Sequence, residues 1–317
     1  MRHRLNARLC AGVLILLSLL GCAGTPQVAS LRQNPGSLPP HAELAGVPFF
    51  PQETHQCGPA SLAMAANFAG VAVSAEALTA QTYLPEREGS LQAEMMAATR
   101  RQGLLAYPLS PSLEDLFREV AAGTPVIVLQ NLGLAAFPKW HYAVVVGYDL
   151  GREEVTLRSG LEPRQILALR TFEYTWARSG YWAMLALPPD RLPATANENR
   201  YVAAALALEQ TNQTRSAQAA YQTALSRWPR NLTARMGLGN TAYAAGDKKL
   251  AEAAFRQAAA DHPRAWMPLN NLAHVLADQQ RYAEALNAAS QAAAMAGPEN
   301  STAQETLREI QKRAARR

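Results

Sequence analysis

Hydrophobic and polar positions follow two different patterns in the two halves of this chain. Between residues 47 and 190, runs with helical spacing come first, and short apolar runs typical of strands follow. Pro59 and three capping serines predict helices over 59–68, 74–83, 90–103 and 112–122. The apolar runs predict strands over 125–130, 141–148, 154–158 and 181–187. Helices followed by an antiparallel set of strands indicate an α+β domain.

From residue 198 to residue 317 the sequence is alanine-rich, has helical spacing and repeats itself every 34 residues. The positions that recur at this spacing include Ala217, Ala251 and Ala285, and likewise Ala224, Ala258 and Ala292. This period resembles that of tetratricopeptide repeats, in which small residues let two helices pack closely. We therefore expect an all-α tetratricopeptide-repeat solenoid of about three repeats (198–231, 232–265 and 266–299) with a C-terminal capping helix. The alternative is a generic helical bundle.

Residues 1–21 have the pattern of a signal peptide. Arg2, Arg4 and Arg8 precede an apolar stretch that is shorter than the roughly 20 residues of a membrane span. The stretch ends in Leu19-Leu20-Gly21-Cys22, which resembles the lipobox of bacterial lipoproteins. This resemblance implies cleavage before Cys22 and its acylation, for example with palmitate, which would anchor the protein to a membrane. Ala23 after the cysteine favours the outer membrane, facing the periplasm; the alternative is an ordinary signal peptide that is cut elsewhere.

Composition predicts a tether before the first domain and a linker after it, and it gives no reason to expect nucleic-acid binding. Residues 22–46 are rich in Pro, Gly, Ser, Gln and Ala and lack periodicity, which predicts a flexible tether. The prolines after residue 187 predict a linker between the domains, ending near Asn197. Loss of the leader removes three arginines and no acid, so the formal net charge falls from +5 to +2. A nearly neutral chain gives no reason to expect nucleic-acid binding.

Cys57 is the candidate nucleophile. Because Cys10 lies in the leader and Cys22 at its end, Cys57 is the one thiol left in the mature chain and cannot form an internal disulfide. Pro59 suits the first turn of a helix, which places Cys57 where free amide groups and the helix dipole favour a thiolate. His141 opens a strand far downstream and is our choice of general base.

Several alternatives surround this pair. The histidines at 3, 41, 262 and 274 lie in the leader, the tether and the repeats, whereas His55 lies two residues before Cys57 and stays open as a base. The oxyanion of an acyl transfer needs two donors, and the backbone amide of Cys57 is one. Gln52 and Gln56 are candidates for the second, and Gln52 is better placed because Gln56 adjoins the nucleophile.

Three separated motifs resemble the papain-like cysteine peptidase family 39, which includes the leader-removing domains of bacteriocin exporters that cut after a double-glycine motif. The motifs are Val47 to Gln52, Gln56 to Met64, and His141 to Asp149. The resemblance covers about 47–188. It implies a papain-like fold, with Cys57 as nucleophile, His141 as general base and acid, and Gln52 as oxyanion donor.

The sequence departs from the family pattern at two places. Gln52 is five residues before Cys57, whereas the exporter domains usually have six. The family usually has an aspartate at the end of the strand after the histidine, and Ser159 stands at that place here. A hydroxyl can orient the imidazole but stabilises its cation poorly. These departures also weaken any transfer of double-glycine specificity.

Together these features predict a membrane-anchored thiol peptidase that cleaves a peptide or protein in the cell envelope. The repeats would recruit a protein partner or the substrate. No cofactor motif and no metal-ligand spacing occurs in the sequence, so no cofactor is expected. The alternative function is a catalytically inactive scaffold lipoprotein in an envelope assembly or export complex. A third class is other thiol chemistry, such as amide hydrolysis in the cell wall.

Overall fold

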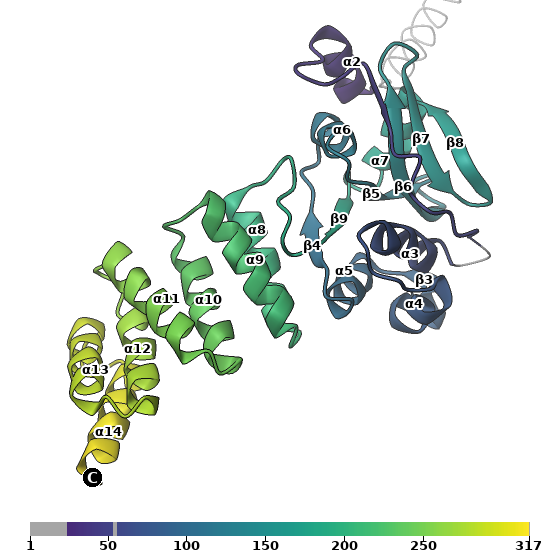
Figure 1. The fold of residues 1–317 in the computed structure, drawn as a ribbon. Coiled ribbons are helices and arrows are strands. Elements are labelled where there is room, and N and C mark those ends of the chain that lie inside the picture. The colour runs from purple at the N-terminus through teal and green to yellow at the C-terminus, as the bar shows by residue number, and fades with distance from the viewer. Residues whose placement is uncertain (1–23, 53–55, 317) are drawn as a thin grey trace, which may run out of the picture.

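A computed structural model describes residues 24–52 and 56–316 of the chain. In it an α+β region is followed by a helical region that extends away from it to the C-terminus (Figure 1). The fold class predicted from the sequence is therefore confirmed. The predicted signal peptide, Cys22 and His55 lie outside the described residues. Within the described part, no helix is long and apolar enough to cross a membrane.

The α+β region is built on one antiparallel sheet of seven strands. Six strands lie in the order β4-β9-β5-β6-β7-β8, and β1 (His41–Glu43) pairs with the far half of β6. The other strands are β4 (Leu105–Pro108), β5 (Val126–Asn131), β6 (Trp140–Asp149), β7 (Glu154–Ser159), β8 (Glu162–Ala168) and β9 (Ala183–Leu187). The long central strand β6 thus pairs with β7 on one side, and with β5 and then β1 on the other.

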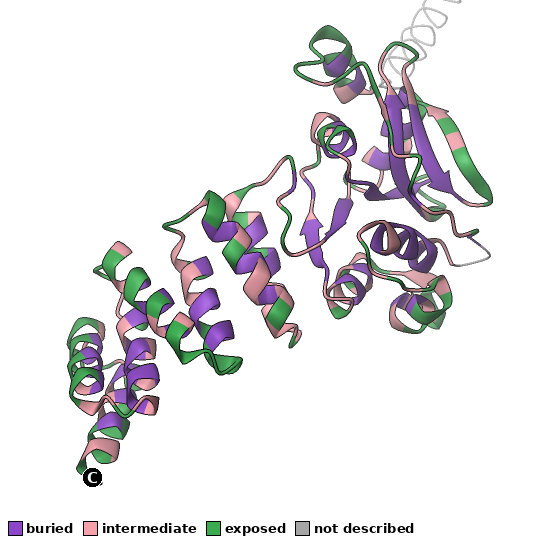
Figure 2. Cartoon of the chain, viewed as in Figure 1, coloured by how far each residue is buried: buried purple, intermediate pink, exposed green. Residues whose placement is uncertain are grey.

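Helices cover both faces of the sheet. The helices α3 (Cys57–Phe68), α4 (Ala75–Thr82) and α5 (Gln92–Arg101) pack on one face. The opposite face carries α2 (Pro26–Gln33), α6 (Leu113–Ala121) and α7 (Leu169–Ala177). Successive residues of β6 alternate between these two cores, since Val144 and Val146 face α3 while Val145 faces α6. Burial on both faces explains the continuous apolar run of β6 (Figure 2).

The segment predicted as a flexible tether over 22–46 is wrong for the residues that the structure describes. Pro26 begins helix α2, whose Val28 and Leu31 are buried. The fully buried carboxylate of Glu173 accepts hydrogen bonds from the backbone amides of Gln27 (2.9 Å) and Val28 (2.7 Å). These bonds satisfy two free amides at the helix start. The tether prediction failed because the hydrogen bonds that hold α2 reach residues 84 to 146 positions away.

The structure also adds elements that the sequence did not indicate. Strand β8, helix α7 and the short strand β4 were not predicted. Ser90, expected as a helix cap, instead belongs to β3 (Gly89–Ser90), which pairs with β2 (Tyr83–Leu84) across the 3₁₀ turn η1 (Pro85–Arg87). Leu91 precedes α5 and makes no side-chain cap.

The helical region consists of three antiparallel pairs and a last helix. The helices are α8 (Glu198–Glu209), α9 (Thr214–Arg227), α10 (Leu232–Ala244), α11 (Lys248–Asp261), α12 (Met267–Asp278), α13 (Tyr282–Ala296) and α14 (Ser301–Ala315). The recurring alanines are all fully buried. Glycine is required where helices approach most closely, because a Cβ on Gly237 would lie 2.2 Å from the ring of Tyr221.

Specific contacts hold the first repeat against the α+β region. The segment 188–197 crosses the junction, and buried Glu119 accepts hydrogen bonds from the backbone amides of Ala194 (3.1 Å) and Thr195 (2.7 Å). The hydroxyl of Tyr107 donates to the carbonyl of Thr195 and accepts from the amide of Asn197. The predicted linker is therefore fixed by side chains of the α+β region.

Candidate active site

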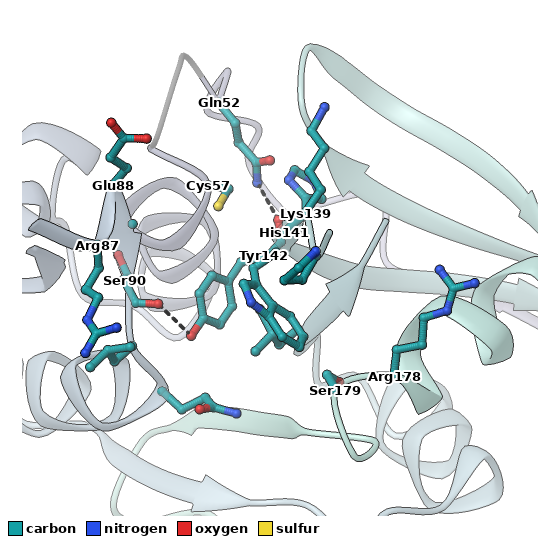
Figure 3. Close-up of a pocket in the computed structure, with 16 residues that line it drawn as sticks. Gln52, Cys57, Arg87, Glu88, Ser90, Lys139, His141, Tyr142, Arg178 and Ser179 are labelled. Atoms are coloured by element: carbon teal, nitrogen blue, oxygen red, sulfur yellow. Dashed lines mark hydrogen bonds between the residues drawn. The ribbon is translucent and has the colours of Figure 1, made fainter. Parts of the chain in front are cut away.

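Three of the predicted site residues line one cavity of about 990 Å³ between α3 and β6. Cys57 is the first residue of α3, His141 is the second residue of β6, and Gln52 lies on the loop that leads to α3. Figure 3 shows their side chains together at one part of the cavity. The thiol of Cys57 lies beside the backbone of Tyr142, the residue that follows His141. The structure thus brings the candidate nucleophile to the strand that carries the candidate base.

Ser159, the fourth predicted site residue, lies beside the imidazole of His141. It is the last residue of β7, the strand next to β6, and its hydroxyl oxygen lies 2.9 Å from Nε2 of His141. The position at which the family usually has an aspartate is thus in contact with the imidazole. With Nε2 directed at Ser159, Nδ1 is the ring nitrogen left for other chemistry. The nearby acid Asp149 lies at the far end of β6, eight positions from His141, where it caps a turn.

The side chain of Gln52 is buried and fully hydrogen bonded. Its oxygen accepts from the backbone amide of Gly160 (2.7 Å), the residue after Ser159. Its Nε2 donates to the hydroxyl of Ser61 (3.0 Å). It also donates to the carbonyl of Tyr142 (3.3 Å), as Figure 3 shows. These bonds fix the amide on the cavity wall. Both N–H donors are occupied, so one of these bonds must break before Nε2 can donate to another group.

Burial decides the protonation of the candidate pair. It raises the pKa of the Cys57 thiol, although backbone amide groups of Tyr142, Gly58 and Cys57 itself favour the thiolate. Burial and, as the smaller cause, the positive charge of Lys139 together lower the pKa of His141 to about 4. Between about pH 5 and pH 8 the structure therefore holds a neutral thiol beside a neutral imidazole. The thiolate expected from the helix terminus does not form, because burial outweighs the amide groups.

Residues that sequence reasoning missed form the remaining walls. Tyr142 donates its hydroxyl to the carbonyl of Ser90 (3.2 Å), which ties the β2–β3 hairpin to the sheet. Gly58 allows this close packing, because a Cβ there would lie 2.5 Å from the hydroxyl of Ser90. The hairpin carries Arg87 into the cavity wall. The aromatic residue after His141 was the only signal for this wall in the sequence.

The other candidates lie elsewhere. Gln56 precedes α3 and is absent from the lining of the cavity. His262 and His274 are hydrogen bonded within the repeats, to the carbonyl of Arg230 and the hydroxyl of Thr306. In the described part of the chain, no group of three or more His, Cys, Asp or Glu side chains is arranged to hold a metal ion.

Two family matches agree with this architecture. Residues 44–184 match the Peptidase_C39 like family, and residues 202–266 match the Tetratricopeptide repeat. No curated protein matches the chain.

Similar solved structures cover the two regions separately. A Bacillus anthracis crystal structure described as a C39-like peptidase is 21% identical (TM-score 0.40) and covers 46% of this chain and 97% of that chain. The type III secretion chaperone SycD of Yersinia enterocolitica, in complex with a peptide of the translocator YopD, is 17% identical (TM-score 0.34), with 36% and 92% covered. The Sgt2 repeat domain of Aspergillus fumigatus is 17% identical (TM-score 0.36), with 38% and 81% covered. On the two family matches, the chain joins a C39-like peptidase domain to tetratricopeptide repeats.

Proposed function

We propose that this protein is a thiol peptidase of the cell envelope, with Cys57 as nucleophile and His141 as general base and acid. The observation that carries the proposal is the convergence of four side chains from separate segments. The thiol of Cys57 lies beside the backbone next to His141, and the imidazole contacts Ser159 at 2.9 Å. The amide of Gln52 is fixed on the same wall by Gly160 at 2.7 Å. Acyl transfer needs a nucleophile, a base, an orienting group and oxyanion donors around one cavity, and these four residues are the candidates for those roles.

The proposed reaction starts from the neutral pair. Nδ1 of His141 takes the proton of the Cys57 thiol while the sulfur attacks the carbonyl carbon of the scissile bond. The C–N bond then breaks, and the imidazolium gives its proton to the leaving amine. A thioester remains on Cys57. His141 next removes a proton from water, the hydroxide attacks the thioester, and the thiol receives the proton as the carboxylic acid leaves. The low pKa of His141 keeps the base available at neutral pH.

The backbone amide of Cys57 and Nε2 of Gln52 are the proposed oxyanion donors. In the resting structure Nε2 donates to the carbonyl of Tyr142 at 3.3 Å, the longer of its two bonds. The oxyanion is a stronger acceptor than a peptide carbonyl, so this bond is the one that the oxyanion would replace. Gln52 is thus held in place before the reaction begins.

Ser159 is the proposed orienting group. In the proposed mechanism Nε2–H of His141 donates to this hydroxyl oxygen, which leaves the lone pair on Nδ1 facing the thiol. Because a hydroxyl can also donate, Ser159 orients the ring without imposing one tautomer as a carboxylate would. A hydroxyl brings no negative charge, so it stabilises the imidazolium less than a carboxylate would. We therefore expect slower proton transfer than in an enzyme with an aspartate at this position.

The proposal extends to where the enzyme acts. Acylation of Cys22 would hold it on the membrane, with the outer membrane as the expected location, facing the periplasm. Tetratricopeptide repeats commonly bind peptides or protein partners, and α8 to α14 would bring such a partner to the enzyme. The proposed reaction uses no cofactor.

A second candidate function is an inactive scaffold, in which only the repeats bind a partner. The high pKa of the Cys57 thiol and the absence of a charged group beside Nε2 among the described residues favour it. The two candidates differ in one measurable property, because only the enzyme turns over a peptide.

The test is incubation of the full chain, in detergent micelles, with a peptide mixture from the cell envelope. A double-glycine leader peptide is added, since the family resemblance implies that substrate. The proposal expects new peptide ends, detected by mass spectrometry, that are absent with Cys57→Ser and with His141→Ala. Identical products from wild type and Cys57→Ser, or no products at all, would favour the scaffold.

A further inference from the structure

The cavity beside Cys57 carries an excess of positive charge. Arg87 lines one wall, from the β2–β3 hairpin, and Lys139 lines the other, just before β6. Arg178 lies at the end of α7 on the same side as Lys139, and Figure 3 shows these cations on both sides of Cys57. Glu88 is the one acidic residue in the lining. The lining thus has three cations and one acid.

Some arginines of the same domain are neutralised by a neighbouring glutamate, whereas the two exposed cations of this cavity are not neutralised by any described residue. Arg32, Arg118 and Arg164 each form an ion pair with a glutamate. Arg87 and Lys139 are both exposed, and neither forms an ion pair with a described residue. Two unpaired cations facing one cavity repel each other, so an anion placed between them would be stabilised.

Hydrogen bonds hold the backbone segments that carry Lys139 and Arg87. The side-chain oxygen of Asn131 accepts hydrogen bonds from the amides of Gly133 (2.9 Å) and Lys139 (2.9 Å), which closes the β5–β6 loop. Arg178 donates to the carbonyl of Gly133 in the same loop and stacks on Tyr174. The Tyr142–Ser90 hydrogen bond described above holds the hairpin of Arg87. A ligand therefore meets cations whose backbone positions are already fixed, which lowers the entropy that binding costs.

Apolar surface lies between the cations. Trp140 is 52% exposed and Leu91 is 45% exposed, and both line the cavity. An extended peptide could therefore place apolar side chains on Trp140 and Leu91 and carboxylates toward Arg87 and Lys139. A basic peptide would meet like charges on both walls.

We propose that the cleft takes an acidic polypeptide segment, with one carboxylate toward Arg87 and another toward Lys139, on opposite sides of the scissile bond. This inference rests on the proposed function for the position of the scissile bond, but the binding preference stands on the cleft alone. Ser159 supplies no charge to the imidazolium. A substrate carboxylate beside Lys139 offsets the repulsion between Lys139 and the protonated form of His141, and so supplies in part what the missing aspartate would have given.

The test measures binding without turnover. The Cys57→Ser full chain is titrated with a labelled peptide that carries glutamates on both sides of a central apolar pair. The same peptide with glutamine at those positions is the control. Because two exposed charge pairs contribute modestly and are screened by salt, we expect the glutamate peptide to bind roughly tenfold tighter at low salt, and less so at high salt.

Charge-reversal variants locate the effect. Arg87→Glu and Lys139→Glu should each remove most of the preference for glutamate. Arg170→Glu is the matched control, because Arg170 is exposed in the same domain but is absent from the lining of the cavity. All three residues are exposed, so the variants should fold, which circular dichroism checks.

Each outcome is informative. Equal binding of the two peptides, or a preference that Arg170→Glu removes as strongly as Lys139→Glu, would overturn the inference. Tighter binding of a cell-wall stem peptide, which also carries carboxylates, would overturn the choice of a polypeptide. A preference for glutamate without cleavage by the wild type would support the basic cleft as a binding site for acidic polypeptides and reject the peptidase.

Discussion

The C39-like domain and the repeats differ in how far apart in the sequence their contacting residues lie. In the repeats, each helix packs mainly on the helices next to it in sequence. For example, the ring of Tyr221 packs closely against Gly237, which is 16 positions away. In the peptidase domain, Cys57 meets the backbone beside His141, and His141 meets Ser159, across long stretches of chain. The proposed chemistry thus depends on residues far apart in the sequence, whereas the repeats, the proposed site of partner binding, are assembled from neighbouring helices.

The largest expected effect is on catalysis and comes from removing the proposed oxyanion donor in the C39-like domain. Gln52→Ala removes the Nε2 donor, so we expect kcat to fall about 10²- to 10³-fold with little change in KM. Gln56→Ala is the matched control, because this neighbouring amide does not line the cavity. The measurement is steady-state cleavage of a peptide found in the envelope mixture, with circular dichroism to confirm folding. An equal loss in both variants would remove Gln52 from the mechanism.

The second prediction sharpens the role of Ser159. The imidazole must be neutral to act as a base, so activity is lost as the pH falls through the pKa of His141, about 4 in this protein. Ser159→Asp places a carboxylate against Nε2, which raises the pKa of His141 by about 1–3 units. The acid limb of the kcat/KM profile should move up by the same amount. Ser159→Ala should leave the limb near pH 4 while lowering the rate. An unmoved limb in Ser159→Asp would separate His141 from the reaction.

The third prediction tests the junction between the two halves. Glu119→Ala removes the carboxylate that accepts from the part-buried amides of Ala194 and Thr195, and hydrogen bonds to charged groups contribute about 1.5–3 kcal/mol. We expect calorimetry to show two separated unfolding transitions, because the first repeat is released from the peptidase domain. Glu114→Ala, at a half-buried position on the same helix, serves as the control. A single unshifted transition in both variants would show that these hydrogen bonds do not couple the halves.

The smallest expected effect is a loss of stability confined to the repeats. In Gly237→Ala the new methyl group meets the ring of Tyr221, and such overpacking typically costs about 1–3 kcal/mol. The thermal transition of the repeats should fall by several degrees, while cleavage of a short peptide stays unchanged. Gly239→Ala should behave alike, because its methyl group meets the ring of Phe255. Loss of cleavage would mean that the two halves form one cooperative unit.

The sequence predicted the repeats more completely than it predicted the C39-like domain. The repeat helices could be predicted, because buried alanines and asparagine caps such as Asn231 recur locally. Strand β8 could not, because it is a largely exposed edge strand with few apolar positions. Helix α7 was hidden by its threonines and aromatic residues, which favour strands. Strand β1 is three residues long and is recognised by its pairing with β6.

The candidate site was predictable in its identities but not in its electrostatics. The motifs around Cys57 and His141 carry enough local information to name these residues. Their protonation depends on burial and on Lys139, which only the folded chain places beside the imidazole. The hydrogen bond from Gly160 to Gln52 and the hairpin that carries Arg87 are likewise products of tertiary packing. Sequence reasoning therefore named candidate residues that the structure places around one cavity, but it did not foresee that burial raises the pKa of the Cys57 thiol.

The most direct test of the central claim is to trap the acyl-enzyme. The full chain is mixed with a peptide that it cleaves, quenched with acid within the first turnover, and mapped by mass spectrometry. The account predicts an acyl group in thioester linkage on Cys57, formed by wild type and lost in His141→Ala, which retains the thiol. An acyl group on another residue, or equal acylation of Cys57 without His141, would contradict it.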